Sequence, residues 1–267
     1  MNTTAASRSP GGLLAILAFV VADLAAIAAL VAGPLYAENL LELRQAFLLL
    51  RWAFFGAAAA GVLALLLVVA KRALKWDTPM GLLLAAFLVA LATAVALYGL
   101  YRNARSVPPI HDVTTDLDDP PAFTVLKPRA DEAEPRVPAG GRADLAPLSP
   151  RERWRVYHEE AYGDLKPLVL SGSVEDVTRL AERVARAMGW QIALSDPAAG
   201  RLEATATTRW FRFKDDVAVR VTPLDGEPGR VRVDVRSVSR IGISDLGANA
   251  KRIRAFLAAL QKAAERS

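Results

Sequence analysis

The chain has 267 residues, no cysteine, a hydrophobic fraction of 53% and a net charge of +5. The absence of cysteine excludes disulfides, thiolate metal sites and a cysteine nucleophile. Its basic excess, 33 Lys and Arg against 28 Asp and Glu, comes without zinc-finger spacing or a long basic run, so nucleic acid is not an expected partner. This hydrophobic fraction is too high for an ordinary soluble protein, which indicates that the apolar residues are concentrated in one part of the chain.

Three apolar segments lie within residues 1–101, at 13–32, 46–70 and 80–100. A helix rises about 1.5 Å per residue, so each segment is long enough to cross a hydrocarbon core of about 30 Å. A cleaved signal peptide is the alternative for the first segment, but its apolar run is too long and only Arg8 precedes it. The sequence therefore predicts three transmembrane helices, with the lipid bilayer as a partner.

Basic residues beside the predicted spans indicate the orientation. Lys71, Arg72 and Lys75 cluster in the second loop, whereas the first loop holds a single Arg44. By the positive-inside rule the second loop is cytoplasmic. We therefore expect a multi-pass protein of the bacterial inner membrane whose C-terminal domain is periplasmic, although Arg102 and Arg105 follow the third span and weaken the bias.

Residues 102–125 contain two proline pairs, which exclude a regular helix and predict an extended segment. We expect this segment to pack on the soluble domain. Possible ligands of a divalent cation cluster in this segment, but their spacing matches neither the EF-hand loop nor any helical zinc motif: His111, Asp112, Asp116, Asp118 and Asp119. Turns in which Asp and Thr side chains bond the local backbone are the favoured interpretation, so no metal is predicted. Residues 126–150 are rich in Pro, Ala and Gly and predict a mobile linker.

Residues 151–267 predict a soluble α+β domain. A capped helix begins at Ser173 and an apolar stripe follows it; four strand patterns and a closing helix that starts near Ser244 and Asp245 come next. This order predicts an antiparallel sheet of about four strands covered by helices, with the helix-grip type as one candidate. The opposite face of the sheet would carry mainly charged residues, which either remain solvated or bind an envelope protein, a lipid or a glycan.

The loop from Thr208 to Asp216 combines three aromatic rings with three cations. Ordinary loops do not expose three large rings together. One hypothesis is that Trp210 and Phe213 close the end of the core. The alternative is that this loop docks on a partner or on the membrane.

Four blocks of the sequence resemble signature blocks of the domain of unknown function 1499 family. These blocks are 108–116, 162–168, 204–216 and 235–249, and together they extend over nearly all of the chain after Tyr101. The family is found in bacterial envelopes and in chloroplasts, sometimes behind membrane spans. The resemblance implies no activity, cofactor or catalytic residue, because the family has none assigned.

The function predicted from these patterns is that of an integral membrane protein presenting an extracytoplasmic binding or scaffolding domain in the cell envelope, without a cofactor. The alternative is a membrane-bound enzyme whose site gathers His111 and Asp112 with Lys214, Asp215 and Asp216, whereas His158 would be a spectator. No hydrolase motif supports that alternative. The candidate functional surface consists of the following residues: His111, Asp112, Asp116, Arg209, Trp210, Lys214, Asp215, Asp216, Ser244, Asp245 and Asn249.

Overall fold

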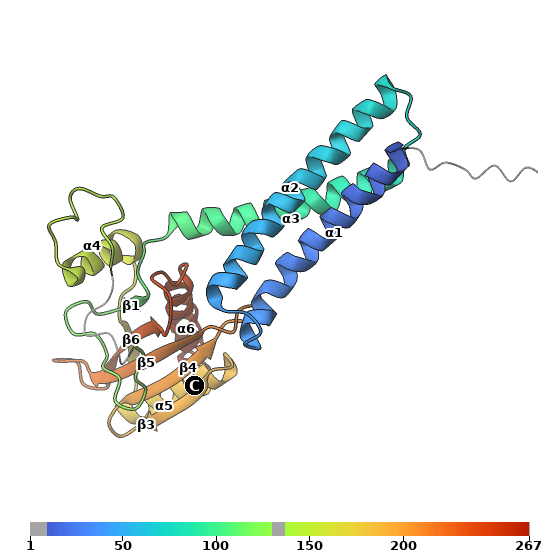
Figure 1. Ribbon diagram of the computed structural model, residues 1–267. Helices are drawn as coiled ribbons and strands as arrows, with labels where there is room; N and C mark the ends of the chain where they lie inside the picture. The colour runs from blue at the N-terminus through green and yellow to red at the C-terminus, as the bar shows by residue number, and fades with distance from the viewer. Residues whose placement is uncertain (1–9, 130–136, 267) are drawn as a thin grey trace, which may run out of the picture. The chain divides into compact units, whose positions relative to one another are not determined.

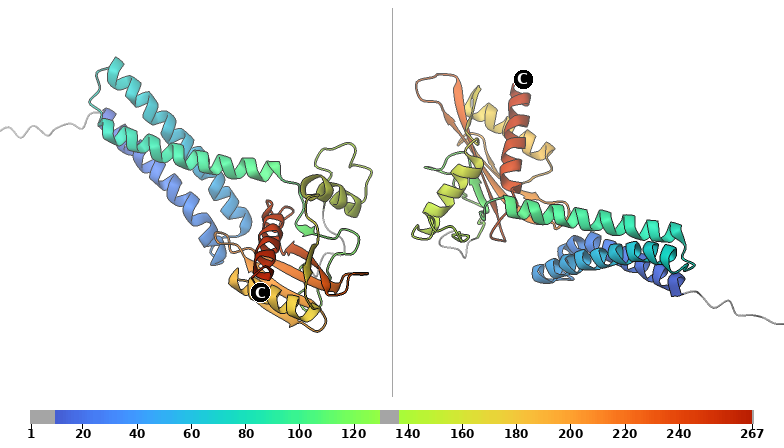
Figure 2. Two further views of the ribbon diagram at one scale, coloured as in Figure 1. Left: turned by 180° about the vertical axis from the view of Figure 1, so that it is seen from behind. Right: turned by 90° about the horizontal axis from the view of Figure 1, so that it is seen from above.

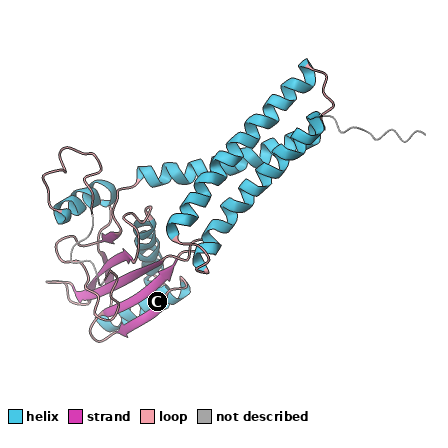
Figure 3. Ribbon diagram, viewed as in Figure 1, coloured by secondary structure: helices cyan, strands magenta, loops and turns pink. Residues whose placement is uncertain are grey.

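A computed structural model describes residues 10–129 and 137–266. The chain forms two compact units, residues 1–103 with 210–212 and residues 104–209 with 213–267. The first unit is helical and the second contains all the strands of the described chain (Figures 1 and 3).

The first unit contains three helices long and apolar enough to cross a membrane. They are α1 (Pro10–Ala37), α2 (Leu43–Ala73) and α3 (Met80–Ser106). The three predicted spans fall within these helices. The three-span anchor inferred from hydropathy is therefore consistent with the structure.

Small side chains mediate the packing of these helices. Alanines at three- and four-residue spacing along α1, including Ala15, Ala18 and Ala22, are fully buried. They lie in small clusters with Leu67 and Ala64 of α2, and with residues of α3. Apolar side chains gain nothing by leaving lipid for protein, so helices in a membrane associate through such close contacts between small residues.

The second unit is built on an antiparallel sheet of six strands. Its strand order is β1-β6-β5-β4-β3, and β2 also pairs with β6. The strands are β1 (Asp112–Thr114), β2 (Leu168–Ser171), β3 (Gln191–Asp196), β4 (Arg201–Thr207), β5 (Lys214–Pro223) and β6 (Arg230–Ser239); the helices are α4 (Pro150–Tyr162), α5 (Val174–Ala187) and α6 (Ala248–Ala264).

Helices α5 and α6 cover one face of the sheet (Figure 2). The alternation in β6 explains why: Val231, Val233 and Val235 are buried in the same core as Ile253 and Phe256 of α6. The predicted α+β class with an antiparallel sheet is confirmed. The sheet has two more strands than expected, because β1 and β2 have only three and four residues and so show no clear alternation.

The opposite face of the sheet is partly covered by another segment of the chain. The segment that follows β1 lies against it, and buries Glu203 and Asp234 to 2% and 1% exposure. Glu203 accepts bonds from the backbone N–H groups of residues 124–126 and from Thr124 Oγ1. Burial alone would raise the pKa of Glu203, but these bonds outweigh it and lower the pKa. We call residues 110–129 the strap.

Part of the predicted mobile linker, residues 130–136, lies outside the described residues, so its mobility stays a prediction. The described part contributes Val137 and Leu145 to the core of the second unit. Arg153 donates to the carbonyl oxygens of both residues. The side chains of α4 thus fix the backbone that precedes the helix.

Candidate functional site

Helix α4 completes an open edge of the sheet. On either side of β1, His111 O and Thr115 N bond to β6, so the backbone groups of Asp112 and Thr114 point away from β6. Trp154 Nε1 donates to Asp112 O at 2.8 Å, and His158 Nε2 accepts from Thr114 N at 3.1 Å. Residues four apart share one face of a helix, so these two side chains take the place of a neighbouring strand.

The bond from Thr114 N fixes the tautomer of His158. Its Nε2 accepts a hydrogen bond from this backbone N–H, so the ring is neutral and carries its proton on Nδ1. The ring is 1% exposed, and its Nδ1 has no hydrogen-bond partner among the described residues. Burial lowers the pKa of His158 and outweighs the nearby Asp112 charge. His158 is therefore a buried, neutral donor whose proton is unused by the described protein groups.

Tyr162 lies one turn further along the same face of α4. Its ring packs edge-on against His158, with 5.7 Å between the ring centroids. Its hydroxyl is also buried without a partner in the described part of the chain. Burial and the charge of Asp245 raise the pKa of Tyr162 to about 12, so the phenol stays protonated at neutral pH.

A pocket of about 420 Å³ lies beside this face of α4. Its walls come from the start of the strap, from α4, from the connection to β2 and from β6. The charged and polar lining residues include Thr114, Thr115, Asp116, Asp118, Arg155, His158, Glu159, Tyr162, Lys166 and Arg232. We call it the edge pocket. Its volume lies within the usual range for small-molecule sites.

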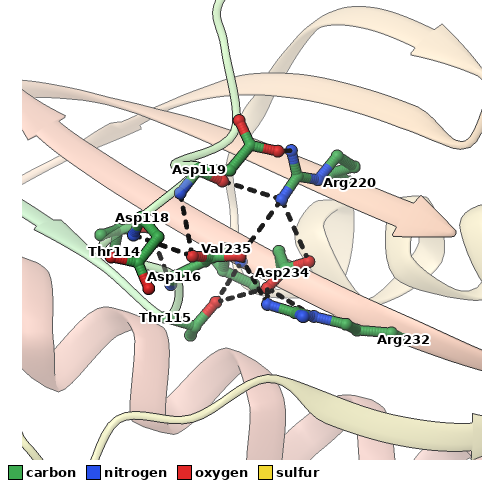
Figure 4. Close-up of polar contacts among 9 residues, drawn as sticks. All are labelled: Thr114, Thr115, Asp116, Asp118, Asp119, Arg220, Arg232, Asp234 and Val235. Carbon is green, nitrogen blue, oxygen red and sulfur yellow. Dashed lines mark hydrogen bonds and ion pairs between the residues drawn. The ribbon is translucent and has the colours of Figure 1, made fainter.

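A network of acids and arginines holds the strap wall of the edge pocket in place (Figure 4). Asp116 pairs with Arg232 at 2.6 Å, and Asp119 pairs with Arg220 at 2.6 Å. Beneath them the buried Asp234 pairs with both arginines, at 2.9 Å to Arg232 and 3.4 Å to Arg220. Its other carboxylate contact is the hydroxyl of Thr115, which donates at 3.3 Å.

Two residues of this network, Asp116 and Arg232, have pKa values shifted in the direction that favours their charged forms. Burial opposes ionisation of Asp116, but the N–H groups of Asp119 and Asp118, together with Arg232 and Arg220, outweigh it and lower its pKa. The bond to Asp234 is the main cause that raises the pKa of Arg232. Asp116 and Arg232 are therefore both stabilised in their charged forms.

The structure separates the eleven residues of the predicted surface into three groups. Asp112, Asp116 and Asp216 lie on the strap side of the sheet, where each pairs with an arginine. Among these only Asp116 lines the edge pocket. Asp112 and Asp216 flank Val238 of β6 on opposite sides.

The second group is a buried polar cluster at the start of α6. Asp245 accepts from the N–H groups of Gly247 and Asn249 and so caps α6, and burial raises its pKa. Asn249 donates to His111 O and accepts from Ser237 Oγ. Asp215 pairs with Arg252, and Ser244 Oγ donates to Pro108 O. These bonds satisfy the polar groups internally, as a structural cluster does.

The proposed enzyme constellation is not assembled as one cluster. Asp215 and Asp216 are neighbours in β5, so their side chains point to opposite faces of the sheet. His111 Nδ1 lies 3.3 Å from Ile243 O, and Asp112 pairs with Arg236. Among the described residues, no group of three or more His, Asp and Glu side chains could hold a metal ion.

The third group is the loop after β4. Arg209 and Lys214 are exposed. Trp210 is 37% exposed and is not part of the core of the second unit. The hypothesis that Trp210 closes this core is therefore wrong.

Sequence reasoning missed His158, which was interpreted as a spectator on an amphipathic helix. The signal was the spacing of Trp154, His158 and Tyr162, four residues apart. Such spacing places three polar-tipped rings on one face of α4. The spacing alone could not show that the edge strand β1 needs a hydrogen-bond donor for Asp112 O and an acceptor for Thr114 N at this face.

A family model described as protein of unknown function (DUF1499) matches residues 112–260. The chain belongs to the DUF1499 family. This match begins at β1 and includes the strap from Asp112 onward, the edge pocket and α6 as far as Leu260. No curated protein matches the chain. The family thus accounts for the second unit and assigns no activity to it.

His158 is expected to make this DUF1499 domain sensitive to mild acid. Its pKa is lowered on folding, so the unfolded chain binds a proton first, and stability present above about pH 6.5 is lost as pH falls. The free energy of unfolding should decrease by up to about 1.4 kcal/mol per pH unit below that value. His158→Gln keeps an acceptor for Thr114 N and cannot titrate. Thermal unfolding between pH 8 and pH 5 should show a flatter profile for His158→Gln, and an unchanged slope would contradict the assignment.

Proposed function

We propose that this DUF1499 protein is a membrane-anchored binding protein whose edge pocket takes a small polar molecule. The observation that carries the proposal is the edge pocket itself. Its strap wall is held by the ion pairs of Asp116, Asp234 and their arginines, and its helix wall by the bonds of Trp154 and His158. A binding site with walls fixed in advance loses little conformational entropy when it binds.

The charges of the edge pocket favour a ligand that carries both signs. Asp116, Asp118 and Glu159 contribute three carboxylates, and Arg155, Lys166 and Arg232 contribute three cations. Arg155 pairs with Asp118 at 2.7 Å and with Glu159 at 2.9 Å, whereas Lys166 is exposed at the rim. A zwitterion can bring its carboxylate to Lys166 and its ammonium group to the carboxylates. Neutral ligands lack these contacts, and simple anions meet the carboxylates unfavourably.

Thermal unfolding of the full chain in detergent tests this proposal. Glutamine and glycine betaine, as zwitterions, are expected to raise the melting temperature more than N-acetylglucosamine or inorganic phosphate. A ligand present at about 100 times its dissociation constant adds about 2.7 kcal/mol of stability. Lys166→Gln should abolish the increase, and Lys251→Gln, on the exposed surface of α6, should retain it.

Two results would contradict the proposed ligand class. One is a larger increase with phosphate or with the sugar than with either zwitterion. The other is an increase that persists in Lys166→Gln, which would place binding outside the edge pocket.

We further propose that the domain lies on the extracytoplasmic side of a bacterial inner membrane. Lys71, Arg72 and Lys75 lie between the apolar stretches of α2 and α3, and this positive loop supports a cytoplasmic position for it. A reporter active only in the periplasm should be active when fused after Arg266 and silent when fused after Lys75. The reverse pattern would reverse the orientation and leave the edge pocket unaffected.

A further inference from the structure

One end of the sheet exposes several large apolar side chains. The connection from β6 to α6 carries Ile241, Ile243 and Leu246, which are 39%, 53% and 36% exposed. Arg240 N donates to Lys214 O, so this connection begins beside the first residue of β5. We call the surface formed by Arg209, Lys214, Arg240, Ile241, Ile243 and Leu246 the loop end.

The exposed charges of the loop end are positive. Arg209, Lys214 and Arg240 are exposed, whereas the three acids nearby are buried. Asp216 pairs with Arg240, Asp215 pairs with Arg252, and Asp245 caps α6. The carboxylates are therefore turned inward, and the outer surface combines apolar side chains with cations.

The chain enters the domain at this same end. Ser244 Oγ donates to Pro108 O at 3.0 Å, and Asp245 N donates to Ile110 O at 3.1 Å. The last apolar stretch of the sequence ends near residue 100, and α3 ends at Ser106. At about 1.5 Å per residue, the helix after residue 100 adds only about 9 Å before the chain reaches the domain.

We propose that the loop end binds the surface of the anionic bilayer that holds the anchor. Apolar side chains ringed by Lys and Arg are the combination by which proteins bind the headgroup region of a membrane. The positive rim complements anionic headgroups, and the short tether keeps the loop end within reach of them. In this arrangement Ile241 and Ile243 enter the interface, while the edge pocket performs its separate binding role.

The natural absence of cysteine allows a direct test with single labels. Ile243→Cys places a fluorophore at the loop end, and Asp225→Cys places the same fluorophore in the β5–β6 turn at the other end of the sheet. Each full-length variant is reconstituted in nanodiscs that contain lipids with a headgroup spin label. In discs with phosphatidylglycerol, quenching at position 243 should exceed quenching at position 225 severalfold. It should weaken in phosphatidylcholine discs and at high salt, because salt screens attraction to headgroups.

A charge-neutralised variant provides the matched control. Arg209→Gln combined with Lys214→Gln should reduce quenching at position 243, whereas Arg183→Gln on exposed α5 should not. Melting temperatures confirm that each variant is folded. Equal quenching at positions 243 and 225 would overturn the proposal. Equal quenching at position 243 in the two kinds of disc would overturn the preference for anionic lipid.

Discussion

A fragment of residues 151–267 is expected to be unfolded, or to melt far below a fragment of residues 105–267. The shorter fragment loses the buried side chains of Ile110, Val113, Val137 and Leu145. Complete burial of an aliphatic side chain contributes about 1.5–3 kcal/mol, so their loss removes roughly 6–12 kcal/mol. A domain of this kind has a total stability of about 5–15 kcal/mol.

The loss of polar contacts also lowers the stability of the shorter fragment. Without the strap, Glu203 loses the N–H donors of residues 124–126 and Arg236 loses Asp112. Urea unfolding of both fragments by circular dichroism measures the difference. The single variant Ile110→Ala in the longer fragment is the control and should cost about 2–5 kcal/mol. Equal unfolding midpoints for the two fragments would show that the strap does not stabilise the domain.

Replacing Trp190 by alanine is expected to cost about 3–5 kcal/mol, whereas replacing Trp210 should change the stability of the domain by less than about 1 kcal/mol. Trp190 is 7% exposed and stacks on Phe256 of α6, with 5.0 Å between the ring centroids. Truncation there leaves a cavity between α5, α6 and the sheet. Trp210 is 37% exposed and outside that core.

The two tryptophan variants form a matched pair because they remove the same ring. Thermal or urea unfolding of the fragment of residues 105–267 separates their effects. A large loss of stability in Trp210→Ala would restore the hypothesis that its ring closes the core. A small loss in Trp190→Ala would mean that its ring does not support the packing of α6.

The core and the strap differ in how far they can be predicted from the sequence. The valines of β6 alternate with charged residues, so the face of the strand that packs against α6 was readable directly. The opposite face was equally readable as charged. The segment that covers this face was not readable, because it contacts β6 through residues far away in the sequence: Asp116 pairs with Arg232, and Thr115 Oγ1 donates to Asp234.

Local sequence was sufficient to predict the three apolar helices, the α+β class, the Ser173 cap of α5 and the DUF1499 resemblance. These depend on local hydrophobic periodicity, on capping residues and on motifs that neighbouring residues carry. The structural role of His158, the position of the edge pocket and the separation of Asp215 from Asp216 became visible only in the folded chain. The backbone N–H and C=O groups of β1, an edge strand of three residues, need hydrogen-bond partners. Side chains of a helix some 40 residues later in the chain supply these partners. The amino-acid sequence near β1 does not indicate which residues supply these bonds, so the pairing is recognised only when β1 and α4 are seen together.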